Sequence, residues 1–161
     1  MNAETKTAAA PQDDHDLYRS IVLEHARAPH NFGPLPAATH AADGINPLCG
    51  DKLALRLRID ADQRIRDARF EGTGCAISIA SASILTDEIR GLSLSEAHGV
   101  FDRFMAMLDG DTAAPGERLP RALRALGGVR QYPSRVKCAT LAWHAMASAT
   151  RERGDEPVTT E

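Results

Sequence analysis

Hydrophobic residues recur at regular intervals along the chain, and their spacing predicts a small sheet surrounded by helices. Over 52–59 every second residue is leucine or isoleucine, which is typical of a half-buried strand. The residues at 60–63 predict a hairpin turn, and 65–70 then form a second strand antiparallel to the first. A third extended stretch is expected over 39–44.

Helical spacing accounts for most of the remaining apolar residues. Helices are predicted over 17–27 with Asp16 as cap, over 76–90, and through an apolar stripe at 100–108 with Ser93 or Ser95 as cap. A short helix is expected around 119–126, and a last helix from about 135–138 to 151. This order predicts an α+β fold in which a small antiparallel β-sheet of about three strands packs against several α-helices.

The two ends of the chain lack this periodicity. Residues 1–16 and 152–161 are polar, small or acidic, and we expect them to be disordered tails. Residues 17–151 then form a single domain, which is long enough to bury a proper core.

The charge and the apolar runs exclude some classes of function. A formal net charge of −3 without a basic stripe argues against a nucleic-acid-binding protein. No apolar run approaches the roughly 20 residues that span a bilayer, and the N-terminal residues contain no secretory h-region. We therefore expect a cytoplasmic protein, in which cysteines favour metal binding or reactive thiol chemistry over stable disulfides.

All three cysteines stand in settings that suit a thiolate. Cys49 lies in the turn-forming segment NPLCGD, Cys75 follows GTG, and Cys138 follows RVK near the start of the last predicted helix. Cys75 and Cys138 are expected in the first turns of separate helices, where free backbone N–H groups stabilise a thiolate. With Asp51 the cysteines offer the four ligands that zinc prefers, but thiolates also hold iron–sulfur clusters, and free cysteines are often simply buried.

Charged residues beside the third cysteine are open to two interpretations. Lys137 can attract a thiolate or lie on the surface, and Arg135 can bind an anion or a partner carboxylate or be exposed. The six histidines are expected to be structural or exposed rather than metal ligands.

Four segments of the chain resemble the U-type iron–sulfur assembly proteins, the family of SufU, IscU and the N-terminal domain of NifU. They follow the family's order: YRSIVLEHARAPHNFG (18–33), NPLCGD (46–51), ARFEGTGCAISIASAS (68–83) and RVKCATLAWH (135–144). The chain is similar to the SufU branch, because the scaffold branch typically has histidine where Lys137 precedes the third cysteine. Residues 110–133 also resemble an insertion typical of SufU.

The resemblance implies a zinc-dependent sulfur acceptor, or sulfurtransferase, of the SUF system. Zn²⁺ would be bound by Cys49, Asp51, Cys75 and Cys138. Docking of a SufS-type cysteine desulfurase, a pyridoxal phosphate enzyme, would free the Cys49 thiolate to accept persulfide sulfur. The sulfur would then pass to the downstream iron–sulfur assembly machinery, and whether the chain is an enzyme in its own right stays open.

Two other functions are compatible with the same residues. One is a scaffold that binds an iron–sulfur cluster on the three thiolates and passes it on. The other is a structural zinc module that only binds proteins, in which the loss of any ligand would unfold the chain. For residues 110–133, partner docking and packing are both open.

Overall fold

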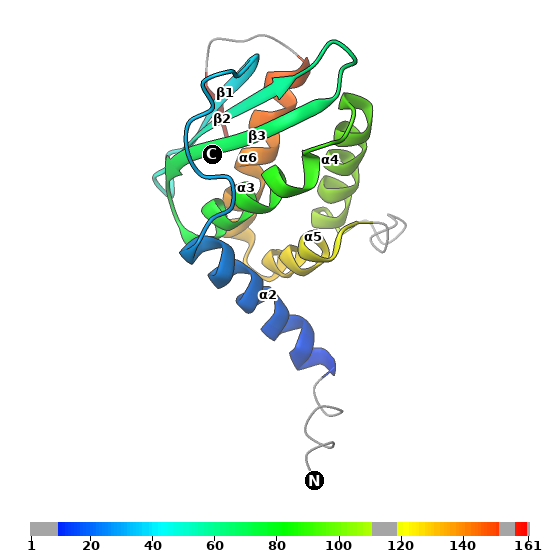
Figure 1. Ribbon diagram of the computed structural model, residues 1–161. Coiled ribbons are helices and arrows are strands. Elements are labelled where there is room, and N and C mark those ends of the chain that lie inside the picture. The colour runs from blue at the N-terminus through cyan, green and yellow to red at the C-terminus, as the bar shows by residue number, and fades with distance from the viewer. Residues whose placement is uncertain (1–9, 111–118, 152–156, 161) are drawn as a thin grey trace.

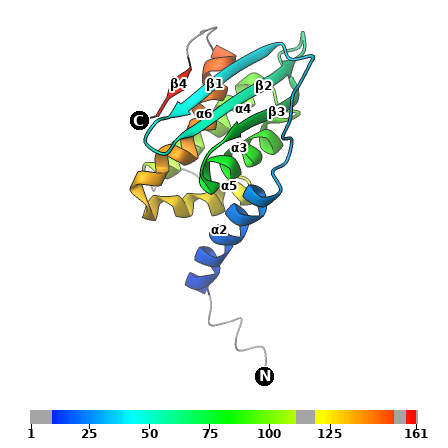
Figure 2. The same ribbon diagram turned by 90° about the vertical axis from the view of Figure 1, so that its left-hand side faces the viewer.

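A four-stranded sheet with helices on one of its faces forms the centre of the fold (Figure 1 and Figure 2). The computed structural model describes residues 10–110, 119–151 and 157–160. The predicted α+β class is confirmed. In chain order the elements are α2 (Ala10–Arg27), β1 (His40–Asn46), β2 (Asp51–Ile59), β3 (Ile65–Thr73), α3 (Ala76–Ile89), α4 (Leu94–Leu108), α5 (Arg121–Leu126), the 3-10 helix η2 (Gly127–Gln131), α6 (Pro133–Arg151) and β4 (Val158–Thr159).

The sheet has the order β3-β2-β1-β4 and is mixed rather than purely antiparallel. β1 and β3 flank β2 in antiparallel register, with Asn46 directly opposite Asp51. β4 runs parallel to β1, and just beyond it the Thr160 N–H donates to the Ile45 carbonyl at 3.2 Å. The prediction of about three antiparallel strands is therefore corrected. β4 is held by backbone pairing with the free edge of β1, and so short a strand carries no periodic signal.

Both predicted tails are partly ordered. α2 begins at Ala10 rather than after a cap at Asp16, and the proline in its first turn is tolerated because backbone N–H groups there have no helical partner. The expectation of disorder is therefore wrong for 10–16 and for 158–159, which form β4. The other residues of the predicted tails, 1–9, 152–156 and 161, lie outside the described residues.

The core lies between the sheet and the helices that cover it. Every second residue of β2 is buried, as the alternation predicts, and α3 and α6 pack on this face. α3 is buried around most of its circumference because it lies between β3, α2 and α6. The Ser81 hydroxyl on α3 donates to the Ala139 carbonyl at 2.6 Å and accepts from Trp143 Nε1 at 3.1 Å, so the buried polar groups of Ser81 and Trp143 are satisfied.

The remaining helices follow the predicted pattern with different ends. Ser93 rather than Ser95 caps α4, in a reciprocal capping box with the glutamate three residues later. The apolar spacing at 119–126 gives α5, but the chain continues past Gly127 as η2 instead of stopping there. α6 begins at Pro133, because proline supplies the φ angle of a first helical residue and needs no N–H partner there.

The described part of the predicted insertion packs against the first helix. α5 and η2 both contact α2, and a Cβ atom at Gly128 would come within 2.8 Å of the Tyr18 ring. Packing is therefore one role of this segment, while 111–118 lie outside the described residues. In the described part of the chain, no helix is both long enough and apolar enough to cross a membrane.

Candidate metal centre

Three chain segments bring the cysteines and Asp51 to the same end of the sheet. Cys49 lies in the turn between β1 and β2, and Asp51 is the first residue of β2. Gly50 between them has a φ of 72°, which glycine adopts without strain. Cys75 follows β3 as the N-cap of α3, and Cys138 lies on α6.

Cys49, Asp51 and Cys138 form the tightest part of this centre. Their ligand atoms all lie within 4.8 Å of one another, and the two sulfurs are free thiols 3.3 Å apart. Cys75 is adjacent: its backbone N–H donates to Asp51 Oδ1 at 2.9 Å, while its sulfur accepts from the Ser78 N–H at 3.4 Å. The structure thus gathers the four predicted residues, with the Cys75 sulfur turned toward the start of α3.

Asp51 is a buried carboxylate without a cation. It is 0% exposed, and no arginine, lysine or histidine of the described residues forms an ion pair with it. Asn46 Nδ2 lies 3.5 Å from Asp51 Oδ2, while Asn46 Oδ1 is buried without a partner. A buried charge is costly unless it is paired or binds a metal. Two thiols and a carboxylate, with a third thiol adjacent, therefore fit a zinc ion.

Gly74 leaves the space that the Asp51 carboxylate occupies. A Cβ atom at this position would lie 2.6 Å from Asp51 Oδ1, so any larger residue would push the carboxylate away. Neither Gly74 nor Asn46 is a predicted site residue. The short turn between β1 and β2 places Asn46 directly opposite Asp51. This turn is the feature of the sequence that could have identified Asn46 as a neighbour of the site.

Cys138 is not in the first turn of its helix, and the prediction for it is wrong. α6 begins at Pro133, so Cys138 lies in the second turn, where its backbone N–H is no longer a free donor. Burial, followed by contacts with Cys49 and Asp51, raises the pKa of the Cys138 thiol. Without a cation this sulfur is therefore protonated at neutral pH. Cys75, directly before the first turn of α3, does have the helix-start environment that the sequence predicts.

Arg135 places positive charge against the site. Its Nη1 donates toward the Cys49 sulfur, 3.8 Å away. A hydrogen bond to Cys138 and the nearby charge of Cys75 raise the pKa of the Arg135 guanidinium. Lys137 is exposed, and its carbonyl accepts from Thr160 Oγ1 at 3.2 Å. Of the two predicted charged residues, Arg135 is the one that reaches a site sulfur.

The histidines lie in several different surroundings. His144 packs edge-on against Phe101, with ring centroids 5.7 Å apart, and burial lowers its pKa. His25 and His30 instead lie with Asp87 in a second cluster of potential ligand atoms. The sequence does not indicate this cluster, because 57 residues separate His30 from Asp87.

Known proteins with similar sequences and folds fall into one group. A protein-family model described as NifU-like N terminal domain matches residues 17–152. The chain is 39% identical over 135 residues to an iron–sulfur cluster assembly scaffold protein IscU of Streptococcus pyogenes serotype M1, covering 84% of this chain and 83% of that protein. It is also 39% identical over 134 residues to the zinc-dependent sulfurtransferase SufU of Bacillus subtilis strain 168, covering 81% and 86%. A solved SufU structure from Fervidobacterium islandicum AW-1 has a TM-score of 0.74 at 30% identity, covering 85% of this chain and 98% of that one.

Proposed function

This chain belongs to the family of NifU-like N-terminal domains, and we propose that it serves iron–sulfur cluster assembly as a zinc-dependent sulfur acceptor. It takes persulfide sulfur from a SufS-type cysteine desulfurase onto Cys49, stimulates that enzyme, and passes the sulfur to the downstream assembly machinery. The family membership supports the assembly process. The names of its relatives support both a scaffold and a sulfurtransferase, so the choice between them rests on the site.

The difference in accessibility between the sulfurs carries the proposal. Cys138 is 0% exposed and lies on a helix in the core, whereas Cys49 and Cys75 are both half-buried. Cys75 is held as the N-cap of α3, where its sulfur accepts from the Ser78 N–H, and Cys49 lies in a turn. Its neighbour Leu48 is 75% exposed. A sulfur acceptor must reach a donor on another protein, and Cys49 is placed to do so.

Cys49, Asp51, Cys75 and Cys138 would hold the zinc ion. When bound, zinc keeps its thiolate ligands deprotonated. The Asp51 carboxylate is buried, it forms no ion pair with a side chain of the described residues, and Gly74 leaves room for it.

The chemical step is a thiol–persulfide exchange. The Cys49 thiolate attacks the outer sulfur of the donor persulfide, a new S–S bond forms at Cys49, and the donor's own S–S bond breaks. The donor cysteine leaves as a thiolate, and Cys49 becomes a persulfide. No external oxidant or reductant is needed. Arg135, whose Nη1 lies 3.8 Å from the Cys49 sulfur, holds positive charge beside the attacking group.

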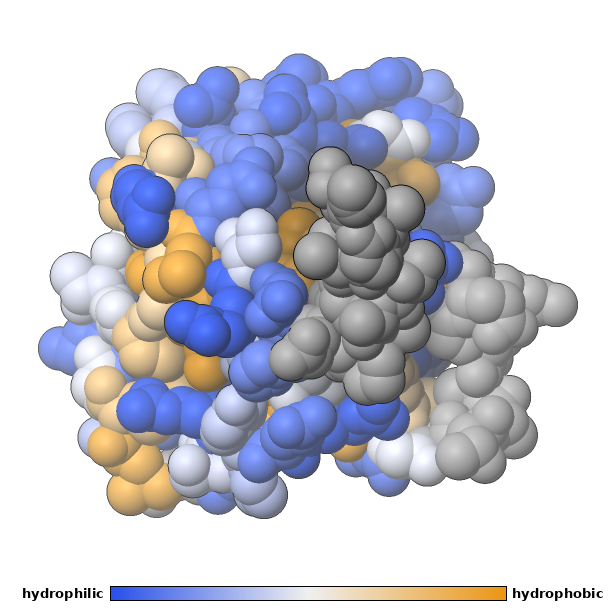
Figure 3. Space-filling view, turned by 90° about the horizontal axis from the view of Figure 1, so that it is seen from below, coloured by the Kyte–Doolittle hydropathy of each residue, from blue (hydrophilic) through white to orange (hydrophobic). Residues whose placement is uncertain are grey.

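The surface around this thiol fits contact with a partner protein. An open hollow of about 530 Å³, lined by α2, the start of α3, Tyr132 and Arg135, lies beside the centre. Leu23 and Tyr132, which line it, are 47% and 42% exposed. Seen from below, the molecule carries a hydrophobic area bordered by hydrophilic residues (Figure 3). We assign this side of the molecule to the desulfurase, and the proposal places the protein in the cytoplasm.

A cluster scaffold is the second candidate function. Three thiols within one centre favour it, because iron–sulfur clusters are held by thiolates. Lys137, where the scaffold branch typically has histidine, is exposed. A purely structural zinc module is the third candidate, but it gives no reason for a thiol as accessible as Cys49.

The experiment compares wild-type protein with Cys49→Ala in the presence of a cysteine desulfurase and cysteine. We expect one zinc per wild-type chain, an adduct of about 32 Da (one sulfur atom) on Cys49, and stimulated desulfurase turnover. Cys49→Ala should keep the fold and lose both adduct and stimulation. His144→Gln, which changes a residue packed on Phe101, is the control and should keep both.

Three results would contradict the proposal. Normal stimulation by Cys49→Ala would exclude Cys49 as the acceptor. Anaerobic reconstitution of a stable, transferable cluster at full occupancy would favour the scaffold, and unfolding of Cys49→Ala would favour the structural module.

A further inference from the structure

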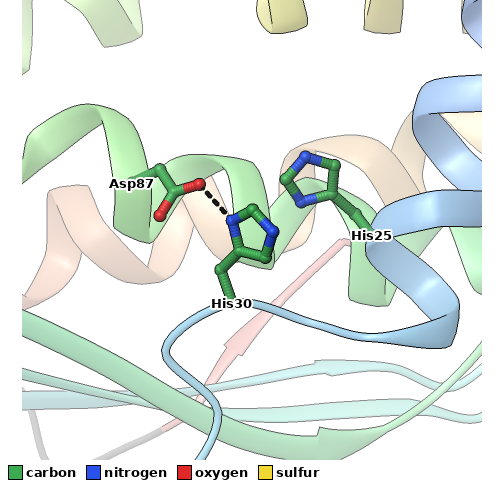
Figure 4. A group of neighbouring side chains, drawn as sticks. All are labelled: His25, His30 and Asp87. Carbon is green, nitrogen blue, oxygen red and sulfur yellow. Dashed lines mark hydrogen bonds and ion pairs between the residues drawn. The ribbon is translucent and has the colours of Figure 1, made fainter.

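His25, His30 and Asp87 meet where the end of α2 lies against α3 (Figure 4). His25 is in the last turn of α2, His30 is in the loop that follows, and Asp87 is on α3. One nitrogen from each histidine and one carboxylate oxygen all lie within 4.8 Å of one another. This histidine cluster has no part in the sulfur chemistry proposed above. Asp87 follows Cys75 by 12 residues (87 − 75), about 18 Å along α3 at roughly 1.5 Å per residue.

Neighbouring groups hold the Asp87 carboxylate in place. His30 Nδ1 and Asp87 Oδ2 are 2.5 Å apart. The other oxygen, Oδ1, accepts from Asn31 Nδ2 at 2.9 Å, and Arg90 Nη1 donates to Asn31 Oδ1 at 2.7 Å. Figure 4 shows the His30 ring between Asp87 and His25, with its second nitrogen on the side of His25. The carboxylate and the imidazole are therefore held close together, and an ion that binds both replaces the hydrogen bond between them.

A serine on α3 positions the two histidines relative to each other. Ser83 Oγ lies 2.7 Å from His25 Nδ1 and accepts from the His30 backbone N–H at 2.8 Å. The two imidazole rings have centroids 4.4 Å apart. Burial, together with the neighbouring His30, lowers the pKa of His25.

We propose that His25, His30 and Asp87 form a second metal site, selective for a divalent ion of the zinc class. Imidazole nitrogen suits zinc and the neighbouring transition metals, whereas magnesium and calcium prefer oxygen ligands. Two imidazoles and a carboxylate leave a fourth position for water. His30 and Asp87 are partly exposed, with side-chain exposures of 43% and 36%, so an ion can enter from solvent. The bound ion joins the end of α2 to α3.

The test is a titration of full-length protein with Co²⁺ after the cysteine centre has been saturated with zinc. Wild type should bind one further equivalent. His30→Gln and Asp87→Asn should each bind it at least about 10-fold more weakly, the lower end of the loss seen for groups that support a metal ligand. His40→Gln, which changes a histidine of β1, is the matched control and should bind as wild type does.

NMR of the wild-type imidazole nitrogens keeps the proposal testable even if a variant fails to fold. Bound Co²⁺ should broaden the signals of His25 and His30 first and leave those of His40 and His144 sharp. The proposal is overturned if no further equivalent binds, if His30→Gln binds as tightly as His40→Gln, or if all histidine signals broaden together. In each case the cluster is only a polar contact between α2 and α3. Since the cysteine centre is filled with zinc before Co²⁺ is added, failure here leaves the sulfur-acceptor proposal intact.

Discussion

Asp51→Asn is expected to stabilise the metal-free protein and destabilise the zinc-bound protein. The substitution removes a charge and keeps the shape of the side chain. Asp51 is 0% exposed, and its oxygen accepts from the Cys75 N–H at 2.9 Å. An asparagine oxygen can accept this bond too, and its amide can donate to the unpartnered Asn46 Oδ1 after rotation of the Asn46 amide.

The magnitude without metal follows from two opposing effects. Burying an unpaired carboxylate costs several kcal/mol even after relaxation, and the variant is freed from this cost. The hydrogen bond from the Cys75 N–H to the side chain at position 51 weakens by about 1 kcal/mol when its acceptor becomes neutral. We therefore expect the free energy of unfolding of the chelated variant to exceed that of chelated wild type by about 1–2 kcal/mol.

With zinc bound, the free energy of unfolding of wild type should exceed that of Asp51→Asn. At a free concentration of about 100 times Kd, zinc stabilises wild type by about 2.7 kcal/mol. Removal of a group that only supports a metal ligand can weaken metal binding by roughly 100-fold. Loss of a charged ligand should weaken zinc binding by at least as much. The same zinc concentration then stabilises the variant by only about 0.4 kcal/mol.

Denaturant unfolding with chelator and with excess zinc measures both differences. Asp43→Asn is the control, because Asp43 is a 55% exposed side chain paired with Arg56 at 3.2 Å. Its stability should change by less than about 0.5 kcal/mol in both conditions. A chelated Asp51→Asn that is less stable than chelated wild type would refute the argument that Asp51 is an uncompensated charge. Equal stabilisation of both proteins by zinc would refute its role as a ligand.

Three further predictions test the surroundings of the site. Gly74→Ala should weaken zinc binding, measured by chelator competition, because the new Cβ would lie 2.6 Å from Asp51 Oδ1. Ser81→Ala should lower the free energy of unfolding by about 1–3 kcal/mol, because it leaves Trp143 Nε1 without its buried partner. The fluorescence of Trp143, the single tryptophan, reports this unfolding. Burial lowers the pKa of His144 below 6.5 in the folded protein. The unfolded state therefore binds the proton first, and stability should fall as pH drops below 6.5, by less than about 1.4 kcal/mol per pH unit from this group. His144→Gln should flatten that slope.

Each of the three has an outcome that contradicts it. Gly99→Ala, on α4, has only an arginine side chain 3.4 Å from the new Cβ and should leave zinc binding unchanged; a loss equal to that of Gly74→Ala would point to a general effect of added methyl groups. Unchanged stability of Ser81→Ala would mean that the tryptophan finds another partner. An equal slope in His144→Gln would assign the pH dependence to other groups.

Local pattern predicted most of the fold but not where its elements end. Alternation placed β2, and the apolar stripe at 100–108 placed α4. The last helix is predicted to begin at about 135–138, whereas α6 begins at Pro133, which places Cys138 in the second turn. Proline is allowed both at the end of a loop and at the first position of a helix, and only the packing of α6 on the sheet selects between the two. β4 depends on the free edge of β1 and has no signal of its own.

The candidate site was predictable in residue type but not in arrangement. Cys49, Cys75, Cys138 and Asp51 could be selected for their chemistry, and the resemblance to a family grouped them. The burial of Asp51 and its bond to the Cys75 N–H arise from the β1–β2 register and from the space at Gly74. The histidine cluster likewise depends on how α2 lies against α3, a contact between distant segments that no local pattern contains.

The placement of the sulfurs explains why one of them can react while the site stays whole. Cys138 is held in the core by α6, and moving it would disturb packing that stabilises the fold. Cys49 is attached through a turn with Gly50 on one side and the exposed Leu48 on the other, so its sulfur can move outward at little cost in buried surface. A donor that draws Cys49 away leaves Asp51 and Cys138 in place. Under the proposed function, the acceptor is the ligand whose loss the fold tolerates best, and the stability of Cys49→Ala should exceed that of Cys138→Ala.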